Sequence, residues 1–332
     1  MKTALITSTG SVAADIVCKS LKRMGFRVVG CNIYPKEWIV ESCEVSAFYQ
    51  APPVAKSDEY LDFMKELCIK EKVQFLLPMI DYELDLLSIN RTWFDEHGVT
   101  LCMSPTSALA ILRNKKKLSD YVAEHCTTIK SIPTSFLCDI EQLKWEFPIV
   151  CKPNDGRSSQ GLQYIHNLAE WNDFKDRVEK SNYIVEPFID GPRIVVEVIR
   201  DAQHCRTVAM VRRELLSTPH GCSLTVLVYE DKALENEVKQ LADMLGIVGD
   251  VNFEFILDAN GIYHLLECNP RFSAGCKFSC MGGYDCVENH MKCFMGEEIE
   301  EYHFKHNMVI ARKYEEFITA TDINVDYCKT NG

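Results

Sequence analysis

Two neighbouring segments decide the fold: Asn252-Phe253-Glu254 and Glu267-Cys268-Asn269-Pro270-Arg271-Phe272-Ser273. Between them lie further apolar residues and the turn sequence Asp258-Ala259-Asn260-Gly261. This pattern predicts a hairpin with strands over 251–257 and 262–266. Because side chains of a strand alternate between its two faces, one face is polar and the other, with Phe253 and Phe255, is apolar.

The polar face of this hairpin gathers oxygen ligands. Glu267, Asn269 and Arg271 repeat a two-residue spacing, and the hairpin brings Glu254 close to Glu267 and Asn269. Three such donors suit Mg²⁺, and Arg271 would point at an anion that the metal holds. The alternative is a solvated strand face with an ion pair. Glu254, Glu267 and Asn269 are therefore candidate metal ligands.

Upstream, a lysine follows an apolar strand. Lys152 ends the run Pro148-Ile149-Val150-Cys151, where it either extends to solvent or meets an anion. The following loop, residues 154–161, has two glycines and also Ser158 and Ser159, whose amides could cover phosphate oxygens, although the P-loop pattern is missing. The alternative is a surface lysine beside a flexible loop.

The segment Tyr183–Gly191 reads as a strand that leads into a hinge. Glu186 and nearby backbone groups could hydrogen-bond the edge of a base, and Phe188 and Ile189 could supply apolar walls. Read locally, a bent edge strand is the alternative.

The first hundred residues alternate strand and helix signals, which predicts a parallel sheet covered on both faces. Helices are expected over 13–25, 60–69 and 81–94, and Gly25 should end the first of them. The turn Ser8-Thr9-Gly10-Ser11 lacks the dinucleotide-binding glycine pattern and is interpreted as a plain strand-to-helix turn. The remainder is expected to be α+β and mostly antiparallel.

Composition restricts the class of protein. A length of 332 residues predicts about two domains, and the net charge of −12 disfavours nucleic acid as a partner. No apolar run is long enough for a bilayer, and the N-terminal residues lack a secretory apolar region, so a cytoplasmic protein without membrane contact is expected.

The 16 cysteines are interpreted as reduced thiols. A zinc site around Cys276, Cys280, Cys286, Cys293 and His290 is disfavoured, because no C-x-x-C pair occurs there and Gly282-Gly283 interrupts the run.

In this order, the elements resemble an ATP-grasp enzyme, most closely the type of the carbamoyl phosphate synthase large subunit. The matching pieces are Asn-Lys-x-x-Leu at 114–118, Pro-Ile-Val-Cys-Lys-Pro at 148–153, Val-Glu-Pro-Phe-Ile-Asp-Gly at 185–191, Asn-x-Glu at 252–254 and Glu-Cys-Asn-Pro-Arg-Phe-Ser at 267–273. The resemblance implies a Rossmann-like pre-ATP-grasp domain over 1–106 and a two-lobed ATP-grasp domain over 107–316. The nucleotide lid would span about 126–190, and 317–332 would form a C-terminal tail.

The resemblance also implies ATP with Mg²⁺, two ions being expected and Mn²⁺ being an alternative. Lys115 and Lys152 would contact the nucleotide phosphates beneath the loop with Ser158 and Ser159. Adenine would be bound by Glu186, by the backbone of Ile189 and beside Phe188. Metal would be held by Glu254, Glu267 and Asn269, and Arg271 would steady the transferred phosphoryl group. Two positions depart from the family: Asn114 replaces an aspartate, and Arg193 replaces the ribose glutamate, so Glu197 becomes the candidate for the ribose.

The similar enzymes activate a carboxylate with ATP and pass the acyl phosphate to an amine, so the resemblance implies small-molecule acid and amine substrates and possible homodimers. An ATP-dependent kinase and a non-catalytic nucleotide-binding subunit are the alternatives. Arg213, with Arg212, is a candidate for the substrate carboxylate, or else both form a surface ion-pair cluster with Glu214. Asp81 and Glu83 could receive an ammonium group, or equally could be charges at a helix N-terminus. The expected catalytic set is Arg271, Lys152 and Arg213.

Overall fold

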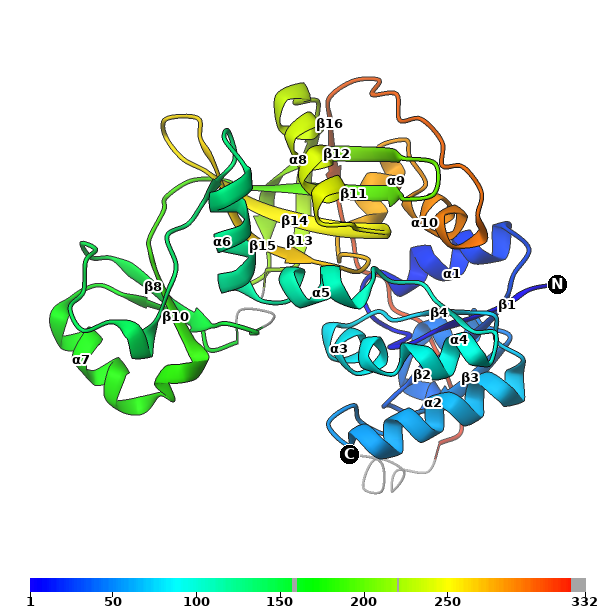
Figure 1. Ribbon diagram of the computed structural model, residues 1–332. Coiled ribbons are helices and arrows are strands. Elements are labelled where there is room, and N and C mark those ends of the chain that lie inside the picture. Colours follow the sequence, from blue (N-terminus) through cyan, green and yellow to red (C-terminus); the bar gives the residue numbers. More distant parts are fainter. Residues whose placement is uncertain (157–159, 220, 324–332) are drawn as a thin grey trace.

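The computed structural model describes residues 1–156, 160–219 and 221–323, which form sheets of five, four and seven strands. In Figure 1 the five-stranded sheet lies at lower right, the seven-stranded sheet in the centre and the four-stranded sheet apart at left. The mixed architecture, with a Rossmann-like domain followed by antiparallel sheets, confirms the predicted fold class.

The N-terminal sheet has the order β3-β2-β1-β4-β5, and its neighbouring strands are all parallel. Its strands are β1 (Thr3–Ile6), β2 (Arg27–Asn32), β3 (Ala47–Gln50), β4 (Phe75–Leu77) and β5 (Thr100–Leu101). Its helices are α1 (Ala14–Arg23), α2 (Ser57–Glu71), α3 (Asp81–Ile89) and α4 (Arg91–Glu96), with short 3₁₀ turns η1 (Lys36–Trp38) and η2 (Val40–Cys43). The predicted parallel sheet is confirmed.

Two helix ends in this domain follow from single residues. Gly25 adopts a φ of +81°, and the Phe26 N–H donates to the Leu21 carbonyl across 3.0 Å, which closes α1 as predicted. The single helix expected over 81–94 is wrong, because Asn90 divides it into α3 and α4. The side-chain amide of Asn90 donates to the Leu86 carbonyl across 2.9 Å, while its own carbonyl accepts from the Trp93 N–H of the next helix.

The four-stranded sheet, which we call the lid, has the antiparallel order β7-β10-β8-β9. Its elements are β7 (Ser135–Phe136), η3 (Leu137–Asp139), β8 (Ile149–Pro153), β9 (Gln163–Ile165), α7 (Leu168–Arg177), η4 (Lys180–Asn182) and β10 (Tyr183–Pro187). These elements fall inside the lid range of about 126–190 expected from the sequence.

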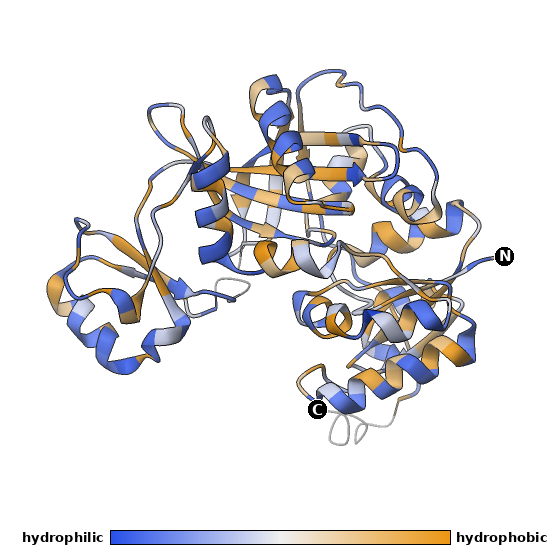
Figure 2. Ribbon diagram, in the orientation of Figure 1, coloured by the Kyte–Doolittle hydropathy of each residue, from blue (hydrophilic) through white to orange (hydrophobic). Residues whose placement is uncertain are grey.

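The seven-stranded sheet has the order β16-β13-β12-β11-β14-β15-β6, antiparallel except between β15 and β6. Its strands are β6 (Lys130–Ser131), β11 (Arg193–Asp201), β12 (Arg206–Ser217), β13 (Ser223–Tyr229), β14 (Gly249–Leu257), β15 (Tyr263–Asn269) and β16 (Met308–Ala311). The accompanying helices are α5 (Thr106–Leu112), α6 (Lys115–His125), α8 (Lys232–Met244), α9 (Cys276–Met281) and α10 (Cys286–Met295). The central strands β11 and β14 are strongly apolar, as Figure 2 shows, and their buried residues pack with residues of α5, α6 and α8 in the core of this domain.

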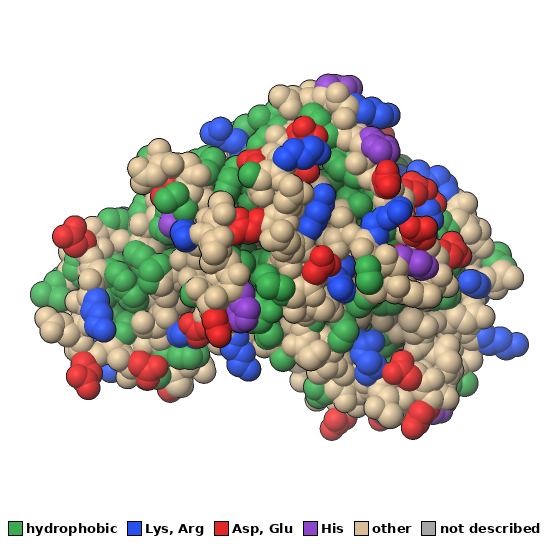
Figure 3. Space-filling model, turned by 45° about the horizontal axis from the view of Figure 1, so that its top comes forward, with side chains coloured by type: hydrophobic (Ala, Val, Ile, Leu, Met, Phe, Trp, Pro, Cys, Tyr) green, Lys and Arg blue, Asp and Glu red, His purple; other side chains and the backbone are tan. Residues whose placement is uncertain are grey.

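The surface carries both signs of charge. On the face shown in Figure 3, Lys and Arg side chains are interspersed with Asp and Glu, without one extended basic area. Within the described ranges, no helix combines the length and apolar character that crossing a membrane requires.

Candidate nucleotide and metal site

A cavity of about 390 Å³ lies where the lid meets the seven-stranded sheet. It is lined by most of the residues predicted to bind nucleotide or metal: Lys115, Lys152, Glu186, Phe188, Ile189, Glu254, Glu267, Asn269 and Arg271. These residues come from α6, the lid and the β14–β15 hairpin, so the fold brings together segments more than a hundred residues apart in the chain.

On the metal face of the hairpin, Glu254 lies close to Glu267 and Asn269 as expected, with a β-bulge between Glu254 and Phe255. Glu254 pairs with Glu267 and Asn252 pairs with Asn269 across β14 and β15. The Asn269 side-chain amide donates to Glu254 Oε1 across 3.2 Å, and Arg193 Nη1 lies 3.6 Å from Glu254 Oε2. Two carboxylates and an amide oxygen on one side of a hairpin are the donor types that Mg²⁺ prefers, so these residues fit the ion.

The two carboxylates have different titration behaviour. Burial, followed by repulsion from Glu267, raises the pKa of Glu254 to about 7. Burial alone would also raise the pKa of Glu267, but the charges of Lys115 and Lys152 outweigh it and hold that pKa below its usual value. A cation beside both carboxylates would offset the burial and the repulsion that raise the pKa of Glu254.

This difference predicts a pH dependence of stability in the absence of metal. Folding raises the pKa of Glu254 from 4.5 to about 7. The contribution of the protonated Glu254 side chain to folding stability is therefore fully present below pH 4.5 and is lost as the pH rises through about 7. In EDTA, Glu254→Gln should therefore become more stable relative to wild type between about pH 5 and pH 8, by about 3 kcal/mol at most. Urea unfolding across this range measures it, with Mg²⁺ expected to shrink the difference. A difference that stays constant with pH would contradict the assignment.

At the base-binding end, two predicted nucleotide contacts pair with each other. Lys152 Nζ lies 2.7 Å from Glu186 Oε2, and both side chains are almost fully buried. The hydroxyl of Thr134 donates to the other oxygen of Glu186 across 3.0 Å. Phe188 packs edge-on against Tyr164 at 5.7 Å between ring centres, and apolar side chains complete this end of the cavity: Ile132, Val150, Ile256 and Leu266. The arrangement suits a flat, partly polar ring.

Lys115 connects the lid to the metal face. Its ammonium donates to the Gly156 carbonyl across 2.7 Å and lies 3.4 Å from Glu267 Oε2. Asn114, which replaces the aspartate of the family, caps α6 by accepting from the Lys117 N–H across 2.9 Å. Asparagine serves this capping role as well as aspartate does. The predicted contacts of Ser158 and Ser159 lie outside the described residues.

Arg271 reaches the N-terminal domain. Its guanidinium donates to Asp81 Oδ2 across 2.9 Å and to Asn269 Oδ1 across 3.3 Å. Asp81 also lies 3.4 Å from Arg113 Nη1, so it sits between two arginines. Asp81 therefore positions Arg271, the residue that the resemblance places at the transferred phosphoryl group.

Two predicted site residues are placed differently by the structure. Arg213 is exposed and does not line the cavity, because it alternates with Arg212 along β12 and points away. Glu197 is fully buried and is not part of the cavity wall; its carboxylate accepts hydrogen bonds from Arg212 and Ser273. The predictions that Arg213 binds substrate and that Glu197 binds ribose are therefore wrong in this geometry.

The residue that takes the place expected for Arg213 is Arg212, which the sequence could not separate from its neighbour. Arg212 lines the cavity, 2% exposed, next to Glu214 and Ser223. Three atoms of cavity-lining residues are among the described buried polar atoms without a hydrogen-bond partner: Arg212 Nε, Arg271 Nε and Glu214 Oε2. In the sequence, only the two-residue alternation of β12 and the position of Ser273 could have distinguished Arg212 from Arg213.

Glu83 is a structural residue. Its carboxylate accepts from Thr7, Ser8, Tyr60 and the Met79 N–H, at the first turn of α3. Of the two open interpretations, the helix N-terminal charge is the one that this geometry supports for Glu83. The turn Ser8–Ser11 joins β1 to α1 and supplies one of these donors, as the interpretation of a plain turn implies.

Comparison with known proteins agrees with this geometry. Residues 179–316 match the family described as ATP-grasp in the biosynthetic pathway with Ter operon, and residues 5–102 match the family described as PylC-like, N-terminal domain. The carbamoyl phosphate synthase large chain of Agathobacter rectalis is 24% identical in an alignment of 340 positions, gaps included, that covers 95% of this chain and 30% of that protein. The same enzyme chain of Thermoplasma volcanium is 22% identical over 313 residues, covering 87% and 29%. The chain thus spans about 30% of the length of these curated relatives.

Three solved structures share the fold over most of the chain. The biotin carboxylase domain of Hydrogenobacter thermophilus 2-oxoglutarate carboxylase, in complex with MgADP, ADP and bicarbonate, has a TM-score of 0.77 at 16% identity, covering 93% of this chain and 74% of that one. N5-carboxyaminoimidazole synthetase from Staphylococcus aureus has a TM-score of 0.71 at 16% identity, covering 90% of this chain and 78% of that one. L-amino acid ligase from Bacillus licheniformis has a TM-score of 0.65 at 16% identity, covering 83% of this chain and 68% of that one. Residues 5–102 are therefore similar to a PylC-like N-terminal domain and residues 179–316 to an ATP-grasp family, and the chain shares its fold with these three structures.

Proposed function

We propose that this protein is an ATP-dependent carboxylate–amine ligase that forms an amide-type bond and releases ADP and phosphate. The observation that carries the proposal is a cavity that joins a base-sized apolar end, two lysines, a carboxylate pair and two arginines, each with a buried Nε that has no hydrogen-bond partner. Fold neighbours named as a carboxyaminoimidazole synthetase and an amino acid ligase support the same reaction class.

Each residue has a role that follows from its position. Glu254, Glu267 and Asn269 would hold Mg²⁺, two ions being proposed, and this metal would supply neutralising charge at the phosphate oxygens. Lys115 and Lys152 would bind the phosphates, exchanging their present carboxylate partners for nucleotide. Glu186, released from Lys152, would accept from the amino group of adenine.

The acid substrate belongs at the arginine end. Arg271 and Arg212 present buried N–H groups there, which suit a carboxylate and a developing phosphoryl charge. A carboxylate oxygen would attack the γ-phosphorus as its bond to the ADP oxygen breaks. The amine nitrogen would then attack the acyl carbon, the bond to phosphate would break, and the amine would lose a proton.

The test is ADP release from MgATP by purified protein with a panel of small acids and amines. We expect ADP only when both substrates are present, and an amide product by mass spectrometry. Release of a stable phosphorylated acid without an amide would instead identify a kinase. Tight MgADP binding without ADP release for any acid–amine pair would contradict the ligase proposal and favour a non-catalytic nucleotide-binding subunit.

We also propose a cytoplasmic location and a homodimer in solution. A related fold is described as a dimer in its crystals, which supports the second point. Sedimentation of the full chain measures the oligomeric state.

A further inference from the structure

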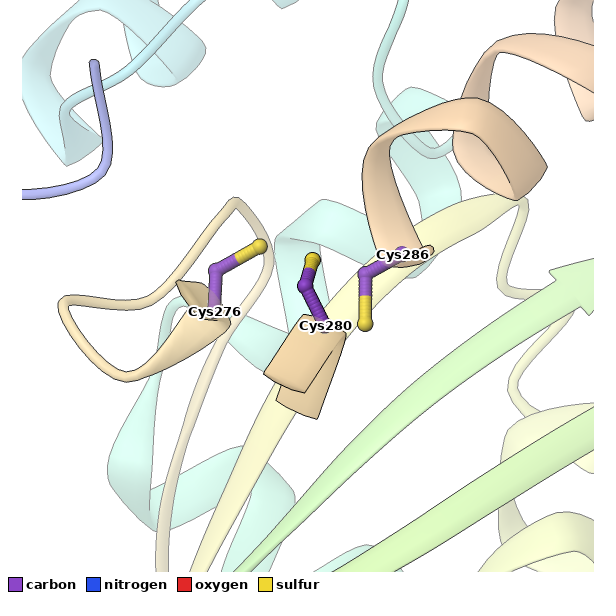
Figure 4. Close-up of side chains that lie close together, drawn as sticks. All are labelled: Cys276, Cys280 and Cys286. Atoms are coloured by element: carbon purple, nitrogen blue, oxygen red, sulfur yellow. The ribbon is translucent and has the colours of Figure 1, made fainter. Parts of the chain in front are cut away.

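Three cysteines meet behind the cavity wall. Cys276 and Cys280 lie on α9, and Cys286 begins α10. Their sulfur atoms all lie within 4.8 Å of one another, and Figure 4 shows Cys280 between the other two. Cys276 and Cys286 are fully buried, and Cys280 is partly exposed. In the described part of the chain, this is the one group of three Cys, His, Asp or Glu side chains that closes so tightly.

The local backbone explains why spacing alone did not reveal the cluster. Residues four apart lie on one face of a helix, which aligns Cys276 with Cys280. The Gly282-Gly283 pair, interpreted from sequence as an interruption, turns the chain sharply: Gly283 adopts a φ of +106° and its N–H donates to the Cys280 carbonyl. This turn returns the chain so that Cys286 faces the other two sulfurs. The glycines therefore assemble the cluster.

The sulfur positions suit a thiophilic ion. Metal–sulfur bonds of about 2.3 Å place the sulfurs of a tetrahedral or trigonal site roughly 3.8–4.0 Å apart. Sulfurs already within 4.8 Å need inward shifts of less than about 1 Å, which small side-chain rotations provide. Thiolate ligands select soft ions such as Zn²⁺ over Mg²⁺.

Neighbouring groups near the cluster have partners outside it. The Cys286 thiol donates to the Tyr284 carbonyl across 3.5 Å, and it would lose this proton on binding an ion. His290 and Cys293, which the sequence grouped with these residues, are engaged elsewhere: His290 accepts from the Asp250 N–H across 2.8 Å, and Cys293 donates to the Asn289 carbonyl across 3.2 Å.

We propose that Cys276, Cys280 and Cys286 form a binding site for one Zn²⁺-like ion, with a fourth position filled by water or a small exogenous ligand. The site is independent of the proposed ligase chemistry. An ion here would tie α9 to α10. Because Ser279 on α9 accepts from Arg212 across 2.7 Å, it would also hold the cavity wall in place.

The test uses the full chain, reduced and metal-free, under anaerobic conditions. Zn²⁺ is titrated in competition with a chromophoric chelator, and Cd²⁺ is titrated while its thiolate charge-transfer absorption is recorded. We expect one tightly bound ion per chain, a rise in Tm of roughly 5 °C with excess Zn²⁺, and at least about 100-fold weaker binding in Cys280→Ser. Cys68→Ser, a buried cysteine on α2 away from the cluster, is the matched control and should bind as wild type does.

A variant that fails to fold does not decide the question, so wild-type protein provides a second measurement. Its cysteines are alkylated with and without Zn²⁺ and mapped by mass spectrometry. Zn²⁺ should protect Cys280 selectively, while the exposed Cys43, Cys138 and Cys205 react equally in both samples. Absence of stoichiometric binding to wild type, unchanged binding by folded Cys280→Ser, or protection that ignores Cys280 would each overturn the proposal.

Discussion

Replacing Glu267 by Gln is expected to lower the rate of ADP release by roughly 10²–10³-fold. The substitution keeps the size of the side chain and removes one negative charge from the metal face. It also removes the partner of Lys115, whose ammonium lies 3.4 Å away. The remaining carboxylate, Glu254, loses the repulsion from Glu267, but burial, the larger cause of its raised pKa, persists. Metal affinity should therefore fall sharply.

The measurement is the dependence of ADP release on Mg²⁺ concentration, with Mg²⁺-dependent binding of ADP as an independent readout. The variant should need a much higher Mg²⁺ concentration, while its unfolding curve stays close to wild type because Glu267 is only half-buried. Glu124→Gln, an exposed carboxylate on α6, controls for a general loss of charge. Unchanged turnover by folded Glu267→Gln at low Mg²⁺ would remove the metal assignment.

The hairpin of the metal face was predictable because its evidence is local. The turn and the two-residue alternation predict a hairpin that brings Glu254 close to Glu267 and Asn269. The exact pairing of Glu254 with Glu267 also needs a β-bulge between Glu254 and Phe255, which the sequence pattern does not reveal. The N-terminal parallel sheet was predictable for a similar reason, since apolar strands and amphipathic helices alternate at short range.

The errors concern residues whose roles depend on contacts between distant segments. Choosing between Arg212 and Arg213 requires the strand's orientation relative to Ser273 and Ser279, which are more than sixty positions away. Glu197 has a polar side chain on a strand near the expected site. Only the structure shows that its carboxylate is already paired with Arg212. The pairing of Asp81 with Arg271 likewise joins two domains and leaves no pattern in the sequence.

The cysteines illustrate the opposite case, in which residues whose spacing matches no metal motif lie close together in the structure. Metal motifs are recognised by short loops such as C-x-x-C, which keep two ligands together without help from the rest of the fold. Here a helix face and a glycine turn do the same for sulfurs four and six positions apart. A search by sequence spacing alone therefore misses side-chain clusters that a helix face and a turn bring together.

Replacing Arg212 by Met is expected to destabilise the protein by about 3–5 kcal/mol, the largest stability effect predicted here. Arg212 and Glu197 form an ion pair whose side chains are 3% and 0% exposed, and Arg212 also donates to Ser273 and Ser279. Removing the guanidinium leaves the Glu197 carboxylate buried beside a second buried acid, Asp250, whose pKa burial and Glu197 already raise well above its usual range. An uncompensated buried charge is the costly part of such a change.

A double variant separates this cost from the role of Arg212 in the cavity. Removing both charges, as Arg212→Met with Glu197→Met, should restore most of the unfolding free energy measured in urea, because apolar side chains of similar volume replace the pair. It should not restore ADP release, since the cavity still lacks the Arg212 Nε group. Arg213→Met, one position along the strand and exposed, should change the unfolding free energy by less than about 0.5 kcal/mol. A loss below about 1 kcal/mol in Arg212→Met would show that the buried pair does not stabilise this face. Recovery of ADP release in the double variant would show that Arg212 acts on the site only by neutralising Glu197.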